Sequence, residues 1–410
     1  EHERSGDRGR ARAALYLLHF SCAAAVMLKG LVGLVLPGGA ILVWALLSRR
    51  ISIVPRLFSP GPLILFLALV LPWHLAIARR DGEWFDFYVV GEHFRRYFES
   101  GHRRDGSPLF FLWALLGGLV PWTPYLGRLA GAFPSIRRGE WRERGGEAYL
   151  QVFWILVLAF FSVSQSKLVP YVLPVWPAVA VLVALGLERA RQLGAPLRAE
   201  RWVSGLAFGL LAGVAAAYAF GAGMAARYGV VPEAIVATAF LALGALLNLV
   251  PARGDARSPR RPVSTERFAL TVAAPWIGFV AALVFALPSV ARSVSPWPLV
   301  AVLQRELRPD DLLLQRGHYL QAPAFYTKRL TPIADLEWSE LDFGRAEAGR
   351  RGLYLSDEEF ARKWHGPVRV LCVVHFGHLR DFGNPALGLS LPHVLAKSPN
   401  GKFFLVTNRP

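Results

Sequence analysis

The sequence predicts an α-helical polytopic membrane protein that ends in a small α/β domain. Hydrophobic residues make up 54% of the 410 residues, and the mean hydropathy is +0.35. Long uncharged stretches fill residues 1–288, which is more apolar sequence than a soluble core of this size needs. After residue 289 the apolar runs shrink to the length of β-strands. These observations divide the chain into a transmembrane domain over 1–288 and a soluble domain over 289–410.

The transmembrane domain is predicted from apolar runs of about 16 to 21 residues, close to the length that crosses hydrocarbon. We expect about nine helices from them. The runs cover residues 13–28, 31–47, 62–78, 109–127, 149–163, 168–187, 202–222, 232–250 and 268–288.

The distribution of charge predicts the orientation of these helices. The formal net charge is +17, and the arginines fall mostly in alternate loops, around residues 49–56, 128–144, 189–201 and 253–267. Arginine-rich loops remain in the cytoplasm, so the amino end is expected there as well. Lys29, the loop 79–108, the corner 164–167 and residues 289–410 then lie on the opposite side. Nucleic acid is not an expected partner, because the arginines follow the loops and form no single basic surface.

The carboxyl-terminal part alternates strand-length apolar runs with polar helical segments. Apolar runs cover 311–315, 368–374 and 403–407, and the residues between them include Ser356 and Glu359, which have the spacing of a capping box. This alternation predicts a small α/β domain outside the membrane. Its histidines match no catalytic pattern, and we interpret them as structural: His318, His365, His375, His378 and His393.

The loop 79–108 holds the densest group of candidate functional residues. Aromatic and small residues recur at helical spacing and predict a helix on the membrane surface: Trp84, Phe87, Tyr88, Gly91, Phe94 and Phe98. Its other side is charged, with Glu92, His93, Arg95, Arg96 and Glu99. Arginine suits a phosphate, because its planar fork of donors matches the phosphate oxygens. The alternative is an exposed helix with ordinary ion pairs.

A metal site is a second possibility in this loop. His93 with Glu92 or His102 offers ligands to a divalent metal ion, which makes such an ion a candidate cofactor. The alternative is a hydrogen-bonded structural histidine.

Two further polar features interrupt apolar sequence on the same expected side. Lys29 and Gly30 break an apolar hairpin, and residues 162–171 gather hydroxyl groups, Lys167 and Tyr171 between two spans. Lys29 can simply snorkel to the surface, and the second segment can be a solvated hairpin. Together with Arg96, however, these cations predict a phosphate-bearing ligand reached from the membrane, such as a lipid phosphate. No glycine-rich nucleotide loop is present, and no nucleotide is expected.

These segments resemble the lipid-linked-sugar glycosyltransferases of the C-type membrane fold, in particular the bacterial 4-amino-4-deoxy-L-arabinose transferases that modify lipid A and the related protein O-mannosyltransferases. Residues 27–37 are similar to that family's Thr-Lys-Gly hairpin, with Met27 and Leu28 in place of the usual Leu-Thr. Residues 92–98 resemble its Glu-His-x-x-Arg-Phe segment, and residues 160–174 its Phe-Phe-Ser-x-Ser-x-x-Lys-Leu-x-x-Tyr-x-Leu-Pro corner. Residues 402–410 resemble the end of its periplasmic domain.

The resemblance implies roles for individual residues. Arg96 and Tyr171 match residues that hold the polyprenyl phosphate, Lys29 matches a lysine of the cavity, and Lys167 lies in the same motif as Tyr171. Glu92, Arg95 and His102 are supporting candidates, and His93 is the candidate metal ligand. The catalytic residue is an acid of the first outer loop, which we expect upstream of Glu1 together with several missing helices. The isolated chain is therefore expected to bind a polyprenyl phosphate weakly without turnover.

The resemblance also implies a function and a location. The expected activity is transfer of a sugar, such as 4-amino-4-deoxy-L-arabinose, from a polyprenyl-phosphate donor to lipid A or another envelope acceptor. The expected location is the bacterial inner membrane, with a periplasmic carboxyl-terminal domain. Two alternatives remain open: an enzyme similar to protein O-mannosyltransferases, and a lipid or solute transporter or non-catalytic binding protein.

Overall fold

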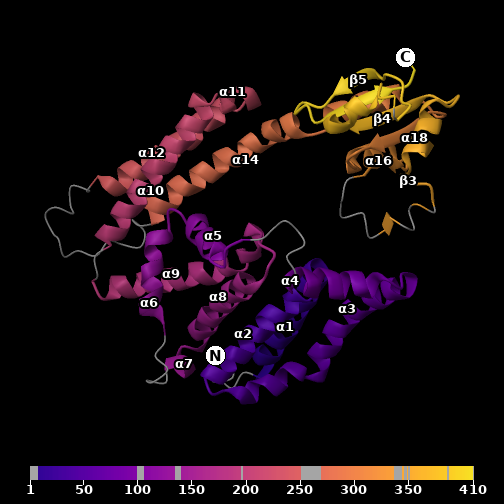
Figure 1. The fold of residues 1–410 in the computed structure, drawn as a ribbon. Helices are drawn as coiled ribbons and strands as arrows, with labels where there is room; N and C mark the ends of the chain where they lie inside the picture. The colour runs from indigo at the N-terminus through magenta and orange to yellow at the C-terminus, as the bar shows by residue number, and fades with distance from the viewer. Residues whose placement is uncertain are drawn as a thin grey trace. The chain divides into compact units, whose positions relative to one another are not determined.

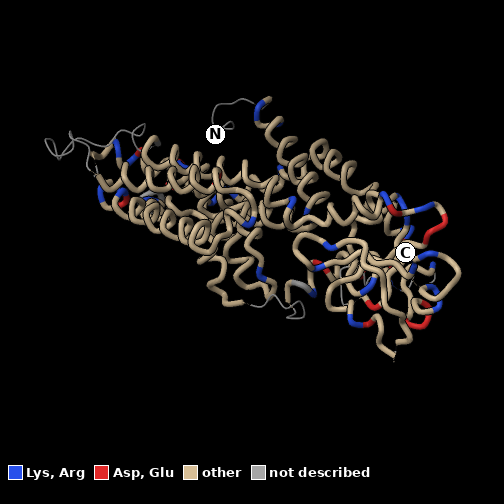
Figure 2. Tube along the Cα trace, turned by 90° about the horizontal axis from the view of Figure 1, so that it is seen from above, with Lys and Arg blue, Asp and Glu red and all other residues tan. Residues whose placement is uncertain are grey.

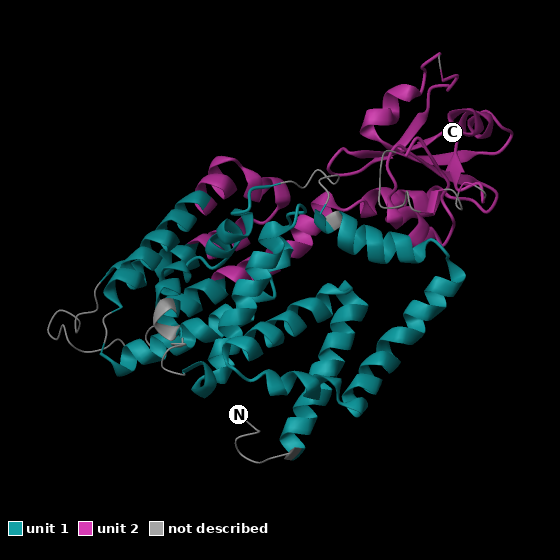
Figure 3. Cartoon of the chain, turned by 60° about the horizontal axis from the view of Figure 1, so that its bottom comes forward, with its two compact units in different colours: residues 1–214, 239–278 teal, residues 215–238, 279–410 magenta. Residues whose placement is uncertain are grey.

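The structure, a computed structural model, consists of two compact units. It describes residues 8–98, 106–133, 140–194, 197–250, 269–336, 344–345, 349, 351–385 and 387–409. The first unit comprises Glu1–Val214 and Ala239–Gly278, and the second Ala215–Thr238 and Phe279–Pro410 (Figure 3).

The first unit is built almost entirely of helices (Figure 1). Its longer helices are α1 (Arg8–Lys29), α2 (Val32–Leu47), α3 (Pro60–Arg80), α5 (Phe110–Gly118), α8 (Gly145–Val163) and α9 (Val175–Gln192). Short elements connect them: η1 (Ile51–Phe58), η2 (Asp86–Arg95), α4 (Arg96–Phe98), η3 (Thr123–Leu126), α6 (Gly127–Ala132), α7 (Glu140–Glu143) and η4 (Val169–Val172). Three helices have residues in both units: α10 (Arg198–Ala216), α12 (Val231–Leu249) and α14 (Ala274–Val294). Three short elements adjoin them in the sequence: η5 (Ala217–Gly221), α11 (Met224–Tyr228) and η6 (Ala269–Ala273).

Helix length and composition support a multi-pass membrane protein. In the described part of the chain, six helices are long and apolar enough to cross a membrane, or up to seven if the bent pair Phe110–Gly118 and Thr123–Leu129 is one span. That pair bends by 115° and overlaps the expected run 109–127, and the run 31–47 forms the shorter apolar helix Val32–Leu47. Charged positions are few along the long helices and frequent in the carboxyl-terminal sheet domain (Figure 2).

The helices of the first unit pack through small and branched side chains. Ala23 and Val26 of α1 contact Val70 of α3 in a buried cluster. A second buried cluster joins Ala40 of α2 to Ala148 of α8, and α8 also packs against α9. Small residues allow close helix approach, which favours packing where the surrounding solvent is apolar.

The second unit contains the predicted α/β domain. Its six strands have the order β3-β2-β1-β4-β6-β5. They are β1 (Leu312–Arg316), β2 (Ile333–Ala334), β3 (Tyr354–Leu355), β4 (Val370–His375), β5 (His393–Lys397) and β6 (Phe403–Thr407). The first four are parallel, and β6 is antiparallel to both β4 and β5. The helices of this domain are α15 (Trp297–Glu306), α16 (Gln321–Thr327), α18 (Asp357–Trp364) and η8 (Phe376–Asp381).

Alternation along the central strands builds a core on each face of the sheet. Leu314 and Cys372 face the cluster that includes Trp364 of α18. Their neighbours Leu313 and Leu371 face the opposite cluster, which includes residues of α15. This is the period of two expected for a strand with both faces covered. The predicted capping box of α18 is confirmed, because the Ser356 side chain accepts from the Glu359 N–H and the Glu359 carboxylate accepts from the Ser356 N–H.

Candidate functional site: a cavity in the helical unit

The first unit contains a cavity of about 880 Å³. Four segments of its sequence line the cavity: residues 27–35, the pair Trp73 and His74, residues 88–98, and residues 160–171. Three of these segments are the ones that the sequence analysis selected. Most of the lining is aliphatic or aromatic, while Lys29 and Glu92 supply charge. The cavity therefore combines a surface suited to hydrocarbon with a charged part.

Lys29 and Tyr171 lie together in this cavity, as the resemblance implied. Lys29 is the last residue of α1, and its Nζ lies 5.9 Å from the centre of the Tyr171 ring. That distance permits a cation–π attraction. The ring is held in place by Phe161, whose ring centre lies 4.8 Å away, and it stacks on Phe111 at 6.3 Å. The arrangement places an ammonium and an aromatic ring that carries a hydroxyl side by side in the lining of one cavity.

Arg96 can be placed only by its backbone. It begins the short helix α4, between Phe94 and Tyr97, which both line the cavity, but its side chain lies outside the described residues. His102 also lies outside them. Tyr97 anchors the helix α4 to the end of α8 and to the corner that follows it. The Tyr97 hydroxyl donates to the Phe160 carbonyl at 2.7 Å, and the Tyr97 carbonyl accepts from the Gln165 N–H at 3.0 Å.

The segment before Arg96 is a π-helix, not the α-helix that the aromatic spacing predicted. In a π-helix, the backbone hydrogen bonds join residues five apart. Tyr88 and His93 are five residues apart in η2 and both line the cavity, which Phe98 of the α-helical α4 lines as well. Phe98, expected on the lipid side, therefore shares the cavity with His93. The lipid side and the charged side are not separated as the sequence analysis expected.

Of the supporting candidates, Glu92 lines the cavity and Arg95 contacts a carboxylate. The Arg95 guanidinium donates to both oxygens of the Asp86 carboxylate, at 3.4 and 3.2 Å, and both side chains are more than half exposed. An exposed pair of this kind contributes little stability.

His93 binds backbone groups through both ring nitrogens. Its Nδ1 lies 2.7 Å from the Tyr88 carbonyl, and its Nε2 accepts the Leu31 N–H at 3.0 Å. The carbonyl can only accept, so Nδ1 carries the proton and Nε2 is the bare nitrogen. The lone pair that a metal ion would need is thus already used. These contacts do not fit the metal-ligand role that the sequence analysis considered for His93.

Lys167 makes contacts different from those expected of a phosphate ligand. Its ammonium donates to the carbonyls of Phe161, Ser162 and Ser164, at 3.2, 2.6 and 2.6 Å, and the residue is 7% exposed. The last carbonyls of a helix have no partner within the helix, and a cation placed there satisfies them. Lys167 therefore caps the carboxyl end of α8. The sequence could not show this, because the contact depends on how the chain turns after the helix.

Aromatic residues of α3 and η2 complete one wall of the cavity, and the sequence analysis missed part of this wall. His74 follows Trp73 in the apolar helix α3, and its Nδ1 lies 2.8 Å from the Val70 carbonyl. The His74 ring contacts Trp84 and Tyr88, with ring centres 5.6 and 6.1 Å apart. The sequence does carry a signal for His74, because a histidine within an apolar run is a candidate functional residue.

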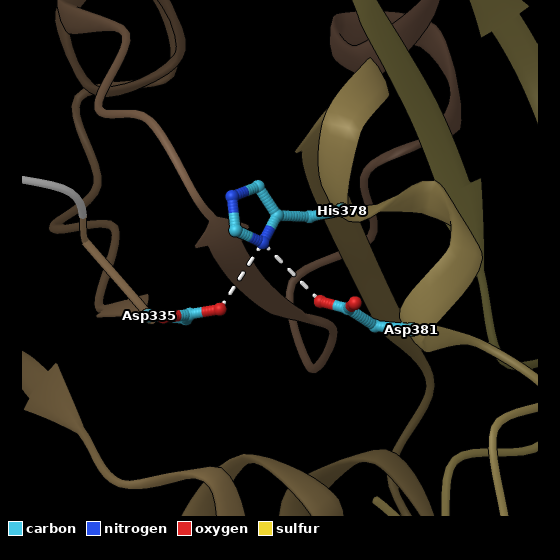
Figure 4. Close-up of side chains that lie close together, drawn as sticks. All are labelled: Asp335, His378 and Asp381. Carbon is cyan, nitrogen blue, oxygen red and sulfur yellow. Dashed lines mark hydrogen bonds and ion pairs between the residues drawn. The ribbon is translucent and has the colours of Figure 1, made fainter.

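The second unit contains a separate group of titratable side chains at the carboxyl ends of the parallel strands (Figure 4). The His378 Nδ1 lies 3.1 Å from an Asp335 oxygen and 3.3 Å from an Asp381 oxygen. Among the described residues this is the one group of three whose candidate metal-ligand atoms all lie within 4.8 Å of one another. The interpretation of His378 as an isolated structural residue missed this grouping.

A buried arginine already supplies positive charge to that group. Arg316, whose side chain is 1% exposed, donates to Asp381 and Asp357, each at 2.8 Å. Burial opposes its charge, but the hydrogen bonds that it donates to Asp357 and Asp381, together with their negative charge, outweigh burial and raise the pKa of Arg316. The group is therefore an ion network centred on a guanidinium.

Comparison with known proteins supports the resemblance inferred from the motifs. No family model matches the chain. The undecaprenyl phosphate-alpha-4-amino-4-deoxy-L-arabinose arabinosyl transferase of Erwinia tasmaniensis is 30% identical over 215 residues, which are 52% of this chain and 37% of that protein. The protein of the same name from Edwardsiella ictaluri is 35% identical over 190 residues, which are 45% of this chain and 32% of that protein. The match thus spans about a third of these relatives' length.

A solved structure extends the likeness to almost the whole chain. ArnT from Cupriavidus metallidurans bound to undecaprenyl phosphate superposes with a TM-score of 0.71 at 23% identity, covering 97% of this chain and 69% of that one. This chain has the ArnT fold. The apo form of ArnT gives a TM-score of 0.73. The predicted fold class and the predicted resemblance to the aminoarabinose transferases are therefore confirmed.

Proposed function

We propose that this chain carries the polyprenyl-phosphate cavity of an integral membrane glycosyltransferase. The observation that supports this most directly is the presence of Lys29 and Tyr171 in one cavity whose remaining lining is largely apolar. A polyprenyl phosphate has the matching chemistry, with a long hydrocarbon chain and an anionic head. The likeness to ArnT bound to undecaprenyl phosphate supports the same ligand.

The proposed reaction moves a sugar from the polyprenyl phosphate to an acceptor oxygen. A bond forms between that oxygen and the anomeric carbon, while the bond from the anomeric carbon to the phosphate oxygen breaks. The electron pair of the broken bond remains on the phosphate, where Lys29 and, by resemblance, Arg96 stabilise the negative charge. A preorganised cation in a water-poor site stabilises such a charge better than water does. The proton of the acceptor goes to an acidic residue, as the resemblance to the family implies.

The names of the relatives point to the sugar, and the resemblance of the sequence motifs implies the acceptor and the location. We propose 4-amino-4-deoxy-L-arabinose as the sugar and lipid A or another envelope glycolipid as the acceptor. We also propose that the chain lies in the bacterial inner membrane, with the cavity and the residues 289–410 on the periplasmic side. Metal ions have no assigned step in this proposal, because both ring nitrogens of His93 bind backbone groups.

A comparison of two lipids tests the proposal. Undecaprenyl phosphate and undecaprenol share one hydrocarbon chain and differ in the phosphate, so their affinities for the detergent-solubilised chain isolate the contribution of the head group. We expect undecaprenyl phosphate to bind roughly tenfold or more tightly, as charge-assisted contacts to an anion would produce. Equal affinity for the two lipids would contradict the proposal.

A further inference from the structure

The position of the Lys29 ammonium depends on a tight turn between α1 and α2. Lys29 ends α1, and Gly30 follows with a φ of +87°, in the left-handed region that favours glycine. The Gly30 N–H donates to the Val26 carbonyl at 2.8 Å, and the Gly30 carbonyl accepts from the Gly33 N–H at 2.9 Å. The turn therefore sets the direction in which Lys29 leaves the helix.

His93 of η2 holds this turn by direct contact. The N–H of Leu31 precedes the first turn of α2, where backbone donors have no partner within a helix. His93 Nε2 accepts that N–H at 3.0 Å from 62 residues away in the sequence. A side-chain acceptor from a distant segment thus fastens the turn to the π-helix.

The approach of His93 to the turn is too close for any residue other than glycine. A Cβ at position 30 would lie 2.2 Å from His93 Nε2 and 3.0 Å from the Tyr88 hydroxyl oxygen. Gly30 therefore has two reasons to lack a side chain: its φ and the ring that packs against it.

The His93 ring is itself fixed in orientation. Its Nδ1–H donates to the Tyr88 carbonyl at 2.7 Å, five residues earlier in the π-helix. The Tyr88 ring lies edge-on to the imidazole with ring centres 4.9 Å apart, and it stacks on Trp84 at 5.1 Å. A ring held by a hydrogen bond and by packing can impose its position on the turn.

We propose that His93 is a positioning residue for Lys29. In its Nδ1–H form it holds the turn through Leu31, so that the Lys29 ammonium stays beside Tyr171 and meets the phosphate of the lipid. This role rests on the proposed function, since it assumes that Lys29 binds the head group. It assigns His93 a purpose that depends on a bare Nε2 and not on a metal ion.

Two substitutions separate the two contacts of His93. In His93→Asn the side-chain amide can still donate to the Tyr88 carbonyl but is too short to accept from Leu31. In His93→Gln the longer side chain carries its amide oxygen to the position of Nε2. We expect His93→Asn to weaken undecaprenyl phosphate binding roughly tenfold and to leave undecaprenol binding unchanged. We expect His93→Gln to retain most of the affinity.

A double-mutant cycle with Lys29→Met shows whether His93 acts through Lys29. If it does, His93→Asn has no further effect on undecaprenyl phosphate binding once Lys29 is methionine. Additive losses, or an equal loss for undecaprenol, would overturn the positioning role. Thermal melting of each variant checks that the fold is retained, and a His93→Gln variant that folds yet binds as poorly as His93→Asn would also contradict the proposal.

The same cycle separates this inference from the proposed function. If Lys29→Met leaves the affinity for undecaprenyl phosphate unchanged, the assignment of the cavity to the head group fails. If Lys29→Met weakens binding while His93→Asn does not, that assignment stands and the role of His93 is wrong.

Discussion

The Nζ atom of Lys29 lies 5.9 Å from the centre of the Tyr171 ring, although the two residues belong to distant parts of the sequence. We expect Lys29→Met to weaken the binding of undecaprenyl phosphate about tenfold or more, because an ionic donor to a phosphate contributes about 1.5–3 kcal/mol. Titration of the lipid into detergent-solubilised protein, followed by tryptophan fluorescence, measures the effect.

Lys328 offers a matched control for that substitution. Its Nζ lies 4.4 Å from the Phe325 ring centre, outside the cavity. Lys328→Met should leave lipid affinity unchanged, since it removes a similar cation–aromatic contact elsewhere. Equal weakening by both substitutions would show that the effect is not specific to the cavity.

Lys167 should affect stability. Lys167→Met removes the donor from three carbonyls at the end of α8. We expect a loss of about 3 kcal/mol, at about 1 kcal/mol for each hydrogen bond. A lower melting temperature in detergent, without the loss of head-group discrimination expected for Lys29→Met, is the predicted result.

The exposed Lys402 provides the comparison for this prediction. Lys402→Met should melt like the unmodified protein. A stable Lys167→Met variant that has lost its preference for the phosphate would instead support the phosphate contact inferred from the motif.

Removal of divalent metal ions should not change lipid binding. Both nitrogens of His93 are engaged by backbone groups, which leaves no lone pair for a metal ion in this arrangement. Affinity for undecaprenyl phosphate, measured before and after dialysis against EDTA, should be the same. A loss that added Zn²⁺ restores would show that the metal competes successfully with Leu31.

Arg316 should be essential to the sheet domain. Arg316→Met removes the cation from Asp357 and Asp381, and removal of one partner from a buried ion network costs about 3–5 kcal/mol. We expect a lower melting temperature than that of the control Arg380→Met, which changes an exposed arginine of η8. Equal melting of the two variants would contradict the structural role of Arg316.

The proposed orientation can be tested with two leucines. Leu330 of the second unit is 77% exposed, and Leu193, after α9, is 84% exposed. We expect Leu330→Cys to react with a membrane-impermeant maleimide in spheroplasts, and Leu193→Cys to react only after the membrane is broken. The native Cys22 and Cys372 are buried, which limits their background labelling. Labelling of Leu193→Cys in intact spheroplasts would reverse the proposed orientation.

The sequence located the cavity better than it located the contacts inside it. Lys29 and Tyr171 were selected from charges and phenols at the ends of apolar runs, and they lie together. Lys167 was selected by the same reasoning, yet its ammonium turns to the carbonyls of α8. The difference lies in the local path of the chain after the helix, which residue types alone do not specify.

The histidines show the same limit more clearly. The role of His93 depends on a π-helical register and on a turn 62 residues away in the sequence. The grouping of Asp335, His378 and Asp381 arises because parallel strands end at one edge of the sheet, and no spacing in the sequence reveals it.

Hydrophobic run lengths, arginine-rich loops and alternating strands determined the fold class of this protein by themselves, because burial of apolar surface and satisfaction of backbone hydrogen bonds depend on local pattern. Tertiary structure alone decided which polar side chains face the cavity and which bind backbone. The side chain of a lysine or a histidine can donate a hydrogen bond to an anion or to a carbonyl, and only the positions of distant helix ends determine which of these lies within reach.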